Sequence, residues 1–321
     1  MKTWLPILAL AISSSSMALE FRSQPLELKL PDVTLRGSFE QPLTTAPTPV
    51  ALIIAGSGPT DRDGNSRMMP GRNDSLKMLA QQLAAQGIAT LRYDKRMIGE
   101  STWAQPDESQ LRLDTYVNDA DAWLAELARR GFAKPFLIGH SEGALLATLA
   151  AQRRTVAGVV LLAGAGRPAD QILIEQLQQQ APQLVPESRR ILNELKAGRL
   201  VADVPAELQA LFRPSVQPYM QSWLRRDPAL ELARLTLPVL TISGDADLQV
   251  GAIDAAALAG VAGVQSRRIA NMNHVLKQIA AADLAGQQAS YSNPTVPLAP
   301  ELVPSIVEFV RREAARQGNA P

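Results

Sequence analysis

The sequence contains no cysteine. This absence excludes disulfides, thiolate metal sites, iron–sulfur clusters and a cysteine nucleophile. Histidine is almost as scarce, because only His140 and His274 occur, so a histidine-rich zinc or iron centre cannot be built. The 32 basic and 31 acidic residues leave a net charge of +1, without the basic excess typical of nucleic-acid-binding proteins. A carboxylate site for magnesium or calcium stays open, although no calcium-loop spacing is present.

The remaining composition is that of an ordinary globular protein. Hydrophobic residues make up 46% and charged residues 20% of the 321 positions, which is enough for a sizeable core. The length fits either two domains or one large α/β unit. After the N-terminal segment, no stretch reaches the roughly 18 consecutive apolar residues that predict a membrane-spanning helix.

Residues 1–18 predict a cleavable export signal. Lys2 gives a positive start, 4–12 is an apolar run too short to cross a bilayer, and small residues at Ser16 and Ala18 place cleavage after Ala18. No cysteine follows the run, so a lipoprotein anchor is excluded. We therefore expect a periplasmic or secreted protein without stable membrane insertion, and no nicotinamide or ATP cofactor, because those pools are cytosolic.

Strand and helix patterns alternate along most of the chain. A β-hairpin is expected first, with Pro31 and Asp32 at its turn. The predicted strands are 26–30, 33–39, 50–55, 88–93, 135–139, 156–163, 238–243 and 265–270. The predicted helices are 76–84 with Asn73 or Asp74 as its cap, 114–130, 142–152 and 302–317. This rhythm predicts an α/β fold with a mostly parallel sheet covered by helices on both faces, and an antiparallel edge.

The alternation stops between two of these strands. Residues 168–232 contain several amphipathic helical segments and no convincing strand. We interpret them as a helical cap inserted into a core made of 19–167 and 233–321. The stretch 164–169 has the G-x-G-x-x-A spacing of a dinucleotide site, but Pro168 and its late position in the sheet favour a hinge into the cap.

The sequence GHSEG at 139–143 is the strongest chemical signal. It follows an apolar strand directly and precedes a helix, so it predicts a nucleophile elbow with Ser141 at its apex. The backbone N–H of Glu142 then lies at the positive start of a helix, where it can stabilise an oxyanion. Serine needs a general base. His140 is adjacent on the turn and its side chain should point elsewhere, which leaves His274, just after the last predicted strand.

An acid must orient that histidine. Asp245 and Asp247 both follow the strand at 238–243, and alternation cannot separate them because they are two residues apart. The chain order serine, aspartate, histidine is the one expected of α/β-hydrolases. The Gly-rich loop at 56–64 should supply a second oxyanion donor. A phosphate-binding loop is the rival interpretation, but the Gly-Lys-Ser/Thr ending is absent.

With these motifs in place, the chain resembles the α/β-hydrolase superfamily over nearly all of its length after residue 18. It is most similar to a bacterial esterase and serine-aminopeptidase-like group. The resemblance rests on the loop GSGPTDRDG at 56–64, on RYDKRMIGES at 92–101 and on GHSEG at 139–143. Asn273-His274 and Tyr291 also look like that group.

The resemblance implies roles for individual residues. The acid pattern G-x-x-D-x-x-V falls on Gly244, Asp247 and Val250, which favours Asp247 over Asp245. The first oxyanion donor maps to Ser57. Met97 departs from the group, which usually has glycine there, and this puts the conformation of its loop in question. The charged residues of 61–63 and 94–96 are expected to brace loops as an ion network.

The sequence thus predicts an exported serine hydrolase without cofactor. Its catalytic residues would be Ser141, Asp247 and His274, with the amides of Ser57 and Glu142 as the oxyanion hole. A small-molecule ester with a short or medium acyl chain is the expected substrate. Two alternatives stay open: an aminopeptidase-like amide hydrolase, and a periplasmic binding protein that reuses the fold without catalysis. The first needs a carboxylate in the cap, and the available ones are Glu175, Glu187, Glu194, Asp203 and Glu207.

Overall fold

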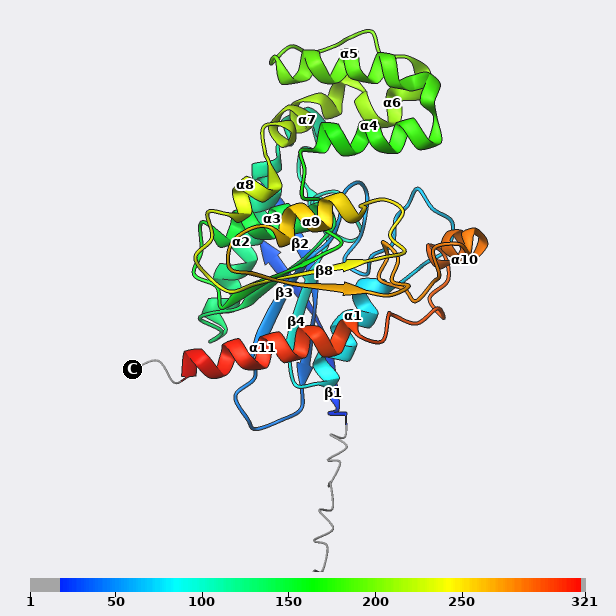
Figure 1. The fold of residues 1–321 in the computed structure, drawn as a ribbon. Coiled ribbons are helices and arrows are strands. Elements are labelled where there is room, and N and C mark those ends of the chain that lie inside the picture. Colours follow the sequence, from blue (N-terminus) through cyan, green and yellow to red (C-terminus); the bar gives the residue numbers. More distant parts are fainter. Residues whose placement is uncertain (1–17, 319–321) are drawn as a thin grey trace, which may run out of the picture.

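The structure is a computed structural model that describes residues 18–318 (Figure 1). Apart from Ala18, the predicted export signal lies outside the described residues. A nine-stranded sheet forms the centre, in the order β1-β2-β4-β3-β6-β7-β8-β9, with β5 paired to β2. The strands are β1 (Phe21–Lys29), β2 (Val33–Pro42), β3 (Val50–Ile54), β4 (Ala89–Tyr93), β5 (Thr102–Trp103), β6 (Phe136–His140), β7 (Gly158–Leu162), β8 (Val239–Gly244) and β9 (Val264–Ile269).

The sheet has a parallel centre and an antiparallel edge, as predicted. β1 pairs antiparallel with β2, and β2 pairs antiparallel with β4. All pairs from β4 through β3, β6, β7 and β8 to β9 are parallel. The carboxyl ends of these parallel strands therefore meet at one edge of the sheet, where loops can bring distant residues together.

Helices cover both faces of the sheet because its central strands are apolar on both sides. Alternate residues of β3 contribute to different clusters: Val50, Leu52 and Ile54 pack with α2 (Leu113–Arg129) and α3 (Glu142–Ala151). Ala51 and Ile53 pack on the other face with α1 (Ser75–Ala85) and α11 (Leu302–Gly318). The predicted three-layer α/β architecture is confirmed.

The segment between β7 and β8 is helical, with an apolar core of its own. In Figure 1, α4, α5, α6 and α7 gather at one end of the molecule, away from the sheet. Ile191, Leu208 and Phe212 are fully buried among them. The helices of this segment are α4 (Ala169–Gln180), α5 (Val185–Lys196), α6 (Gln209–Phe212), α7 (Gln217–Leu224) and α8 (Pro228–Leu232). The division of the chain at 168 and 232 stays a prediction.

Some elements differ from the sequence-based expectation. The short strand β5 and the helices α9 (Ala252–Ala259) and α10 (Leu284–Ser290) are additional. Asp74 precedes α1 in a left-handed conformation and its side chain makes no capping bond. Instead, Oδ1 of Asn73 accepts a hydrogen bond from the Ser75 N–H at 2.8 Å, so Asn73 satisfies the helix start.

Candidate active site

Ser141 occupies a strained turn between β6 and α3. Its φ of 55° and ψ of −121° are unusual for a residue with a side chain. Neighbouring glycines make this turn possible, because a Cβ on Gly139 would lie 2.1 Å from the Gly143 carbonyl oxygen, and one on Gly143 would lie 2.3 Å from that of Ile54. The turn therefore lifts the serine side chain to the carboxyl edge of the sheet, as a nucleophile elbow does.

Ser141, His274 and Asp247 form a continuous hydrogen-bonded series. Nε2 of His274 lies 3.1 Å from Oγ of Ser141, and Nδ1 of His274 lies 2.9 Å from Oδ2 of Asp247. Because Nδ1 faces a carboxylate, it carries the proton, which leaves Nε2 free to accept the serine proton. The histidine and the aspartate are buried. Residues 133 and 27 positions apart in the chain thus meet in one arrangement able to activate a hydroxyl.

Asp247 is held as a carboxylate. Burial alone would raise its pKa, but three effects lower it below its ordinary value: the positive charge that His274 carries when protonated, the hydrogen bond from His274, and the hydrogen bonds from the N–H groups of Gln249 and Val250. Those two amides donate to Oδ1 at 2.8 and 2.9 Å, leaving Oδ2 for the histidine. Asp245 is placed differently: it is exposed, and its Oδ1 accepts from the N–H of Asn271 at 2.6 Å.

Buried side chains fix the loop that carries His274. Asn273 is fully buried, and its Oδ1 accepts from the N–H of Lys277 at 2.9 Å while its Nδ2 donates to Oγ of Ser290 at 2.8 Å. The His140 side chain bonds to this loop, because its Nε2 donates to the His274 carbonyl oxygen at 2.7 Å. This contact, which the sequence did not reveal, ties the elbow directly to the loop of His274.

The predicted oxyanion donors lie beside the nucleophile. Gly56 and Ser57 follow β3, and a Cβ on Gly56 would come within 3.1 Å of the Ser141 Cβ, so the loop passes directly over the serine. Glu142 is the first residue of α3, where a helix leaves its N–H groups without intrahelical partners. Both residues border a cavity that contains Ser141. Ser57 and Glu142 therefore lie on the wall of the cavity that contains the nucleophile.

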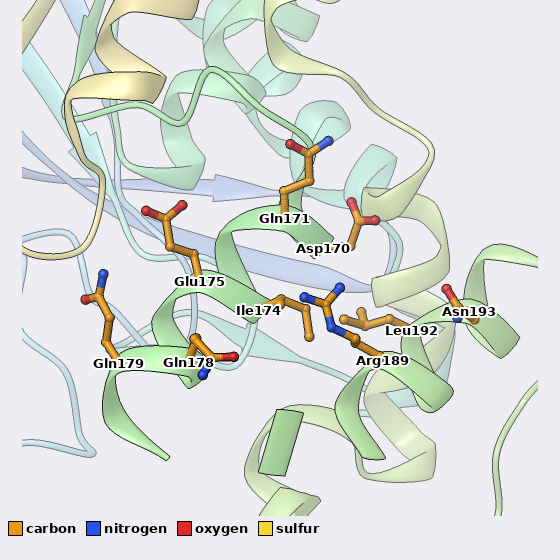
Figure 2. A pocket seen from close by; sticks show the side chains of 9 residues that line it. All are labelled: Asp170, Gln171, Ile174, Glu175, Gln178, Gln179, Arg189, Leu192 and Asn193. Atoms are coloured by element: carbon orange, nitrogen blue, oxygen red, sulfur yellow. The ribbon is translucent and has the colours of Figure 1, made fainter. Parts of the chain in front are cut away.

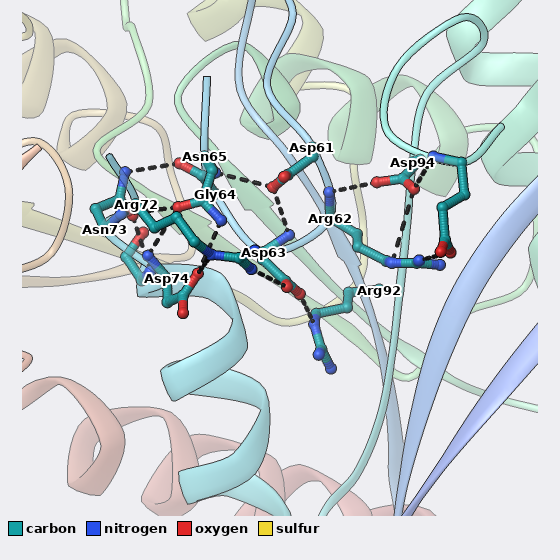
Figure 3. Close-up of polar contacts among 12 residues, drawn as sticks. Asp61, Arg62, Asp63, Gly64, Asn65, Arg72, Asn73, Asp74, Arg92 and Asp94 are labelled. Carbon is teal, nitrogen blue, oxygen red and sulfur yellow. Dashed lines mark hydrogen bonds and ion pairs between the residues drawn. The ribbon is translucent and has the colours of Figure 1, made fainter. Parts of the chain in front are cut away.

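An ion network braces the loop after β3, as predicted (Figure 3). Oδ1 of Asp61 accepts from the N–H groups of Asp63 and Asn65, both at 2.9 Å. Oδ1 of Asp63 accepts a hydrogen bond from Nε of Arg92 at 2.8 Å, and Oδ1 of Asp94 accepts one from the backbone N–H of Arg62 at 2.8 Å. These contacts tie the loop to β4 and to the turn that follows it.

Lys95 departs from that prediction. It is fully buried, and Nζ donates to two backbone carbonyl oxygens of the loop, those of Gly56 at 2.5 Å and Gly58 at 2.9 Å. Burial lowers the pKa of Lys95 below its ordinary value, and the charge of Glu142 opposes this shift. Lys95 therefore contacts the residues that flank Ser57, a role that the sequence motif did not indicate.

Met97 adopts the conformation that glycine would take. Its φ is 65°, in the left-handed region that disfavours side chains, and its side chain is 40% exposed. Gly99 in the same loop also has a positive φ, and a Cβ there would lie 2.2 Å from Oδ2 of Asp94. With methionine in place of glycine at position 97, the turn keeps its conformation, and the positive φ strains the backbone at Met97.

Two cavities meet at Ser141. The larger, of about 760 Å³, contains His274 and is lined mostly by residues with polar side chains. The smaller, of about 110 Å³, contains Glu142 and Leu145 and extends toward the helices between β7 and β8. A third hollow of about 410 Å³ lies between α4 and α5 (Figure 2), and none of the three residues of the series lines it.

Other site types find little support in the described part of the chain. Within residues 18–318, no three carboxylate or histidine side chains gather in a group that could hold a metal ion. None of the helices in this range combines the length and apolar content that crossing a bilayer requires.

The fold and the geometry of the site define an α/β-hydrolase, and comparison with known proteins agrees. The family described as serine aminopeptidase, S33, matches residues 71–276. Esterase EstD of Thermotoga maritima is 31% identical over 242 residues, which cover 70% of this chain. The chain spans 56% of the length of that relative.

Solved structures share the fold at low sequence identity. Est1E from Butyrivibrio proteoclasticus with bound ferulic acid superposes with a TM-score of 0.58 at 18% identity, covering 92% of this chain and all of that one. Proline iminopeptidase from Mycobacterium smegmatis gives a TM-score of 0.58 at 15% identity, with the same coverage. The chain belongs to the serine aminopeptidase S33 family and has the α/β-hydrolase fold.

Proposed function

We propose that this chain is an exported serine carboxylesterase that hydrolyses esters with short or medium acyl chains. The observation that carries the proposal is the hydrogen-bonded series from Ser141 through His274 to Asp247. The name of the relative EstD, an esterase, supports an ester substrate. Export rests on the signal-like sequence of residues 1–18, and no cofactor takes part in the proposed reaction.

The reaction follows from the positions of the side chains. Nε2 of His274 takes the proton of Ser141, whose Oγ bonds to the ester carbonyl carbon. The carbonyl oxygen becomes an oxyanion that the N–H groups of Ser57 and Glu142 stabilise. The tetrahedral intermediate collapses, and the leaving alkoxide receives its proton from His274 while Asp247 holds the imidazolium. Water, deprotonated by His274, then releases the acid from the acyl-enzyme.

The smaller cavity suits the acyl group. Its wall combines apolar side chains with the polar ones of Arg167, Gln176 and Gln249, and its volume of about 110 Å³ favours short chains. The apolar side chains in this wall include Leu145, Ile172, Leu173, Trp223 and Val250. Three of them come from the helices between β7 and β8, so we propose that residues 168–232 form a cap on the core 19–167 and 233–321 and help to select the acyl chain.

The positions of the acids favour ester over aminopeptidase substrates. An aminopeptidase needs a carboxylate for the substrate ammonium, yet none of the five cap carboxylates lines either cavity at Ser141. Glu175 is paired with Arg167 at 2.6 Å, and Glu187 with Arg190 at 2.5 Å. Glu142 borders the smaller cavity, but its side chain is buried beneath the elbow and burial raises its pKa.

The test compares p-nitrophenyl butyrate with an amino-acyl p-nitroanilide on the purified protein. We expect turnover of the ester, and a loss of at least about 10,000-fold in Ser141→Ala and in His274→Ala, with unchanged circular dichroism. Faster hydrolysis of the anilide would identify an aminopeptidase instead. Tight binding of intact ester without turnover would identify a binding protein.

A further inference from the structure

The direction in which an ester lies across Ser141 follows from the position of His274. The leaving oxygen must receive its proton from Nε2 of His274, so the alcohol part lies on the histidine side of the nucleophile. That side is the larger cavity, which contains His274 and Val275. The acyl part then occupies the smaller cavity beside Glu142 and Leu145. This assignment rests on the proposed function.

Most of the residues that line the alcohol side have polar side chains, and none of these carries a permanent charge. Beyond the reacting groups, hydroxyl and amide side chains predominate, with Met69 and Val275 as the apolar exceptions. No aspartate, glutamate, lysine or arginine is among its lining residues. The polar side chains are Thr60, Ser66, Asn73, Gln180, Gln249, Gln288 and Tyr291.

Tyr291, Gln180 and Gln288 are equipped to bind hydroxyl groups, whereas the Asn73 amide is already bonded to the backbone of Gly64 and Ser75. Nε2 of Gln249 donates to the Tyr291 oxygen at 2.6 Å, so the Tyr291 O–H proton is directed elsewhere and can reach a ligand. Burial raises the pKa of Tyr291 to about 12, which keeps that proton in place. The amides of Gln180, at the end of α4, and Gln288, in α10, each offer a donor and an acceptor. A hydroxyl group likewise donates and accepts hydrogen bonds, so it can pair with both groups of each amide.

We infer that the preferred substrate is a short-chain ester of an uncharged, hydroxyl-rich alcohol, such as glycerol or a sugar. An aliphatic alcohol of equal size would displace water from these polar groups without replacing the hydrogen bonds, at about 1–3 kcal/mol for each group left unmatched. A charged alcohol would find no counter-ion among the side chains that line the cavity.

The experiment holds the butyryl group constant and varies the alcohol. We expect kcat/KM for monobutyryl glycerol and butyryl glucose to exceed that for hexyl butyrate and butyrylcholine by at least about tenfold. Gln288→Leu and Gln180→Leu should each lower this preference severalfold. The matched control is Gln178→Leu, on the same helix α4 but in the wall of the hollow between α4 and α5, and it should leave the preference unchanged.

The outcomes separate this inference from the proposed function. Equal or faster hydrolysis of hexyl butyrate, or glutamine variants that behave like Gln178→Leu, would overturn the inference and leave an esterase. A protein that hydrolyses none of the butyrate esters would contradict the proposed function itself.

A second, independent observation concerns Lys95. Its Nζ holds the carbonyl oxygens of Gly56 and Gly58 at 2.5 and 2.9 Å. The carbonyl and the following N–H of a trans peptide point in opposite directions, so this contact turns the Ser57 N–H away from Lys95. We propose that Lys95 is a positioning residue that fixes the orientation of this oxyanion donor.

The surroundings of Lys95 support a dedicated role. The lysine is 2% exposed, with the Tyr116 ring centroid 5.4 Å from Nζ. The buried carboxylate of Glu142, whose own amide is the other oxyanion donor, has no hydrogen-bond partner at Oε1 and acts on Lys95 through its charge. Burying an ammonium group costs free energy of folding. The Lys95 ammonium makes its direct hydrogen bonds to the carbonyl oxygens of Gly56 and Gly58, so its contacts are with the loop that carries Ser57.

The test separates positioning from stability. In Lys95→Met we expect kcat to fall by about 100-fold with little change in KM, and the affinity for a trifluoromethyl ketone, which forms an oxyanion, to fall in proportion. Lys95→Gln, which keeps an N–H donor, should restore part of kcat. Arg96→Met removes a neighbouring, partly buried charge paired with Asp119 at 2.8 Å, and should lower stability without lowering kcat.

Two results would overturn this second proposal. One is an unchanged kcat in folded Lys95→Met. The other is a failure of both Lys95 variants to fold, which would make the lysine a structural residue.

Discussion

The dependence of folding stability on pH should contain a contribution from His140. The pKa of this side chain is lowered from 6.5 to about 4, mainly by burial. The nearby His274 ring lowers the pKa as well, and the hydrogen bond from His140 to the His274 carbonyl oxygen offsets only part of this decrease. Between these two values the unfolded chain binds a proton at His140 that the folded chain excludes. Stability is therefore lost as the pH falls from 6.5 toward 4, by about 3 kcal/mol for this residue.

His140→Gln isolates that contribution. Glutamine does not titrate, and its side-chain amide can still donate to the His274 carbonyl oxygen. We expect urea unfolding between pH 7 and pH 4, followed by circular dichroism, to show that the variant loses about 3 kcal/mol less than the unsubstituted protein. Carboxylates shared by both proteins cancel in the difference. Parallel stability profiles across this range would refute the reasoning, because they would mean that His140 titrates alike in both states.

Two further predictions concern the acid and the strained loop. Asp247→Asn should lower kcat by about 1,000-fold or more, because an amide no longer holds the His274 tautomer. Asp245→Asn should change kcat by less than about tenfold. Steady-state kinetics that give the reverse order would show that the acid is Asp245. Met97→Gly should raise the free energy of unfolding by about 0.5–1 kcal/mol, because it relieves a positive φ of 65°, and a thermal-unfolding scan showing a lower midpoint would contradict this.

Most of the fold could be predicted from local sequence patterns. The strands that follow Pro49, Pro135 and Pro238 are apolar runs bounded by turn residues, and such runs are read without knowledge of their partners. Helix α9 was not predicted because its sequence, AIDAAALA, has almost no polar residues to reveal a period. Helix α10 contains Gly286, which weakens its helical signal.

For the site too, the residues that could be predicted are those whose signal lies in adjacent sequence. Ser141 is recognisable because its glycines and its flanking strand and helix are adjacent to it in the chain. Choosing Asp247 over Asp245 required the resemblance, since both follow the same strand. The contacts of His140 with His274 and of Lys95 with Gly56 join residues 134 and 39 positions apart, and no local pattern encodes them. Such contacts become visible only in the folded arrangement.

The most direct test of the account is whether Ser141 is an activated nucleophile. The purified protein is treated with a fluorophosphonate probe, and the modified residue is located by mass spectrometry, with His274→Ala treated in parallel. The account predicts a single stoichiometric adduct on Ser141, loss of ester hydrolysis in step with labelling, and greatly slowed labelling in His274→Ala. No adduct on Ser141, or labelling at the same rate without His274, would contradict it.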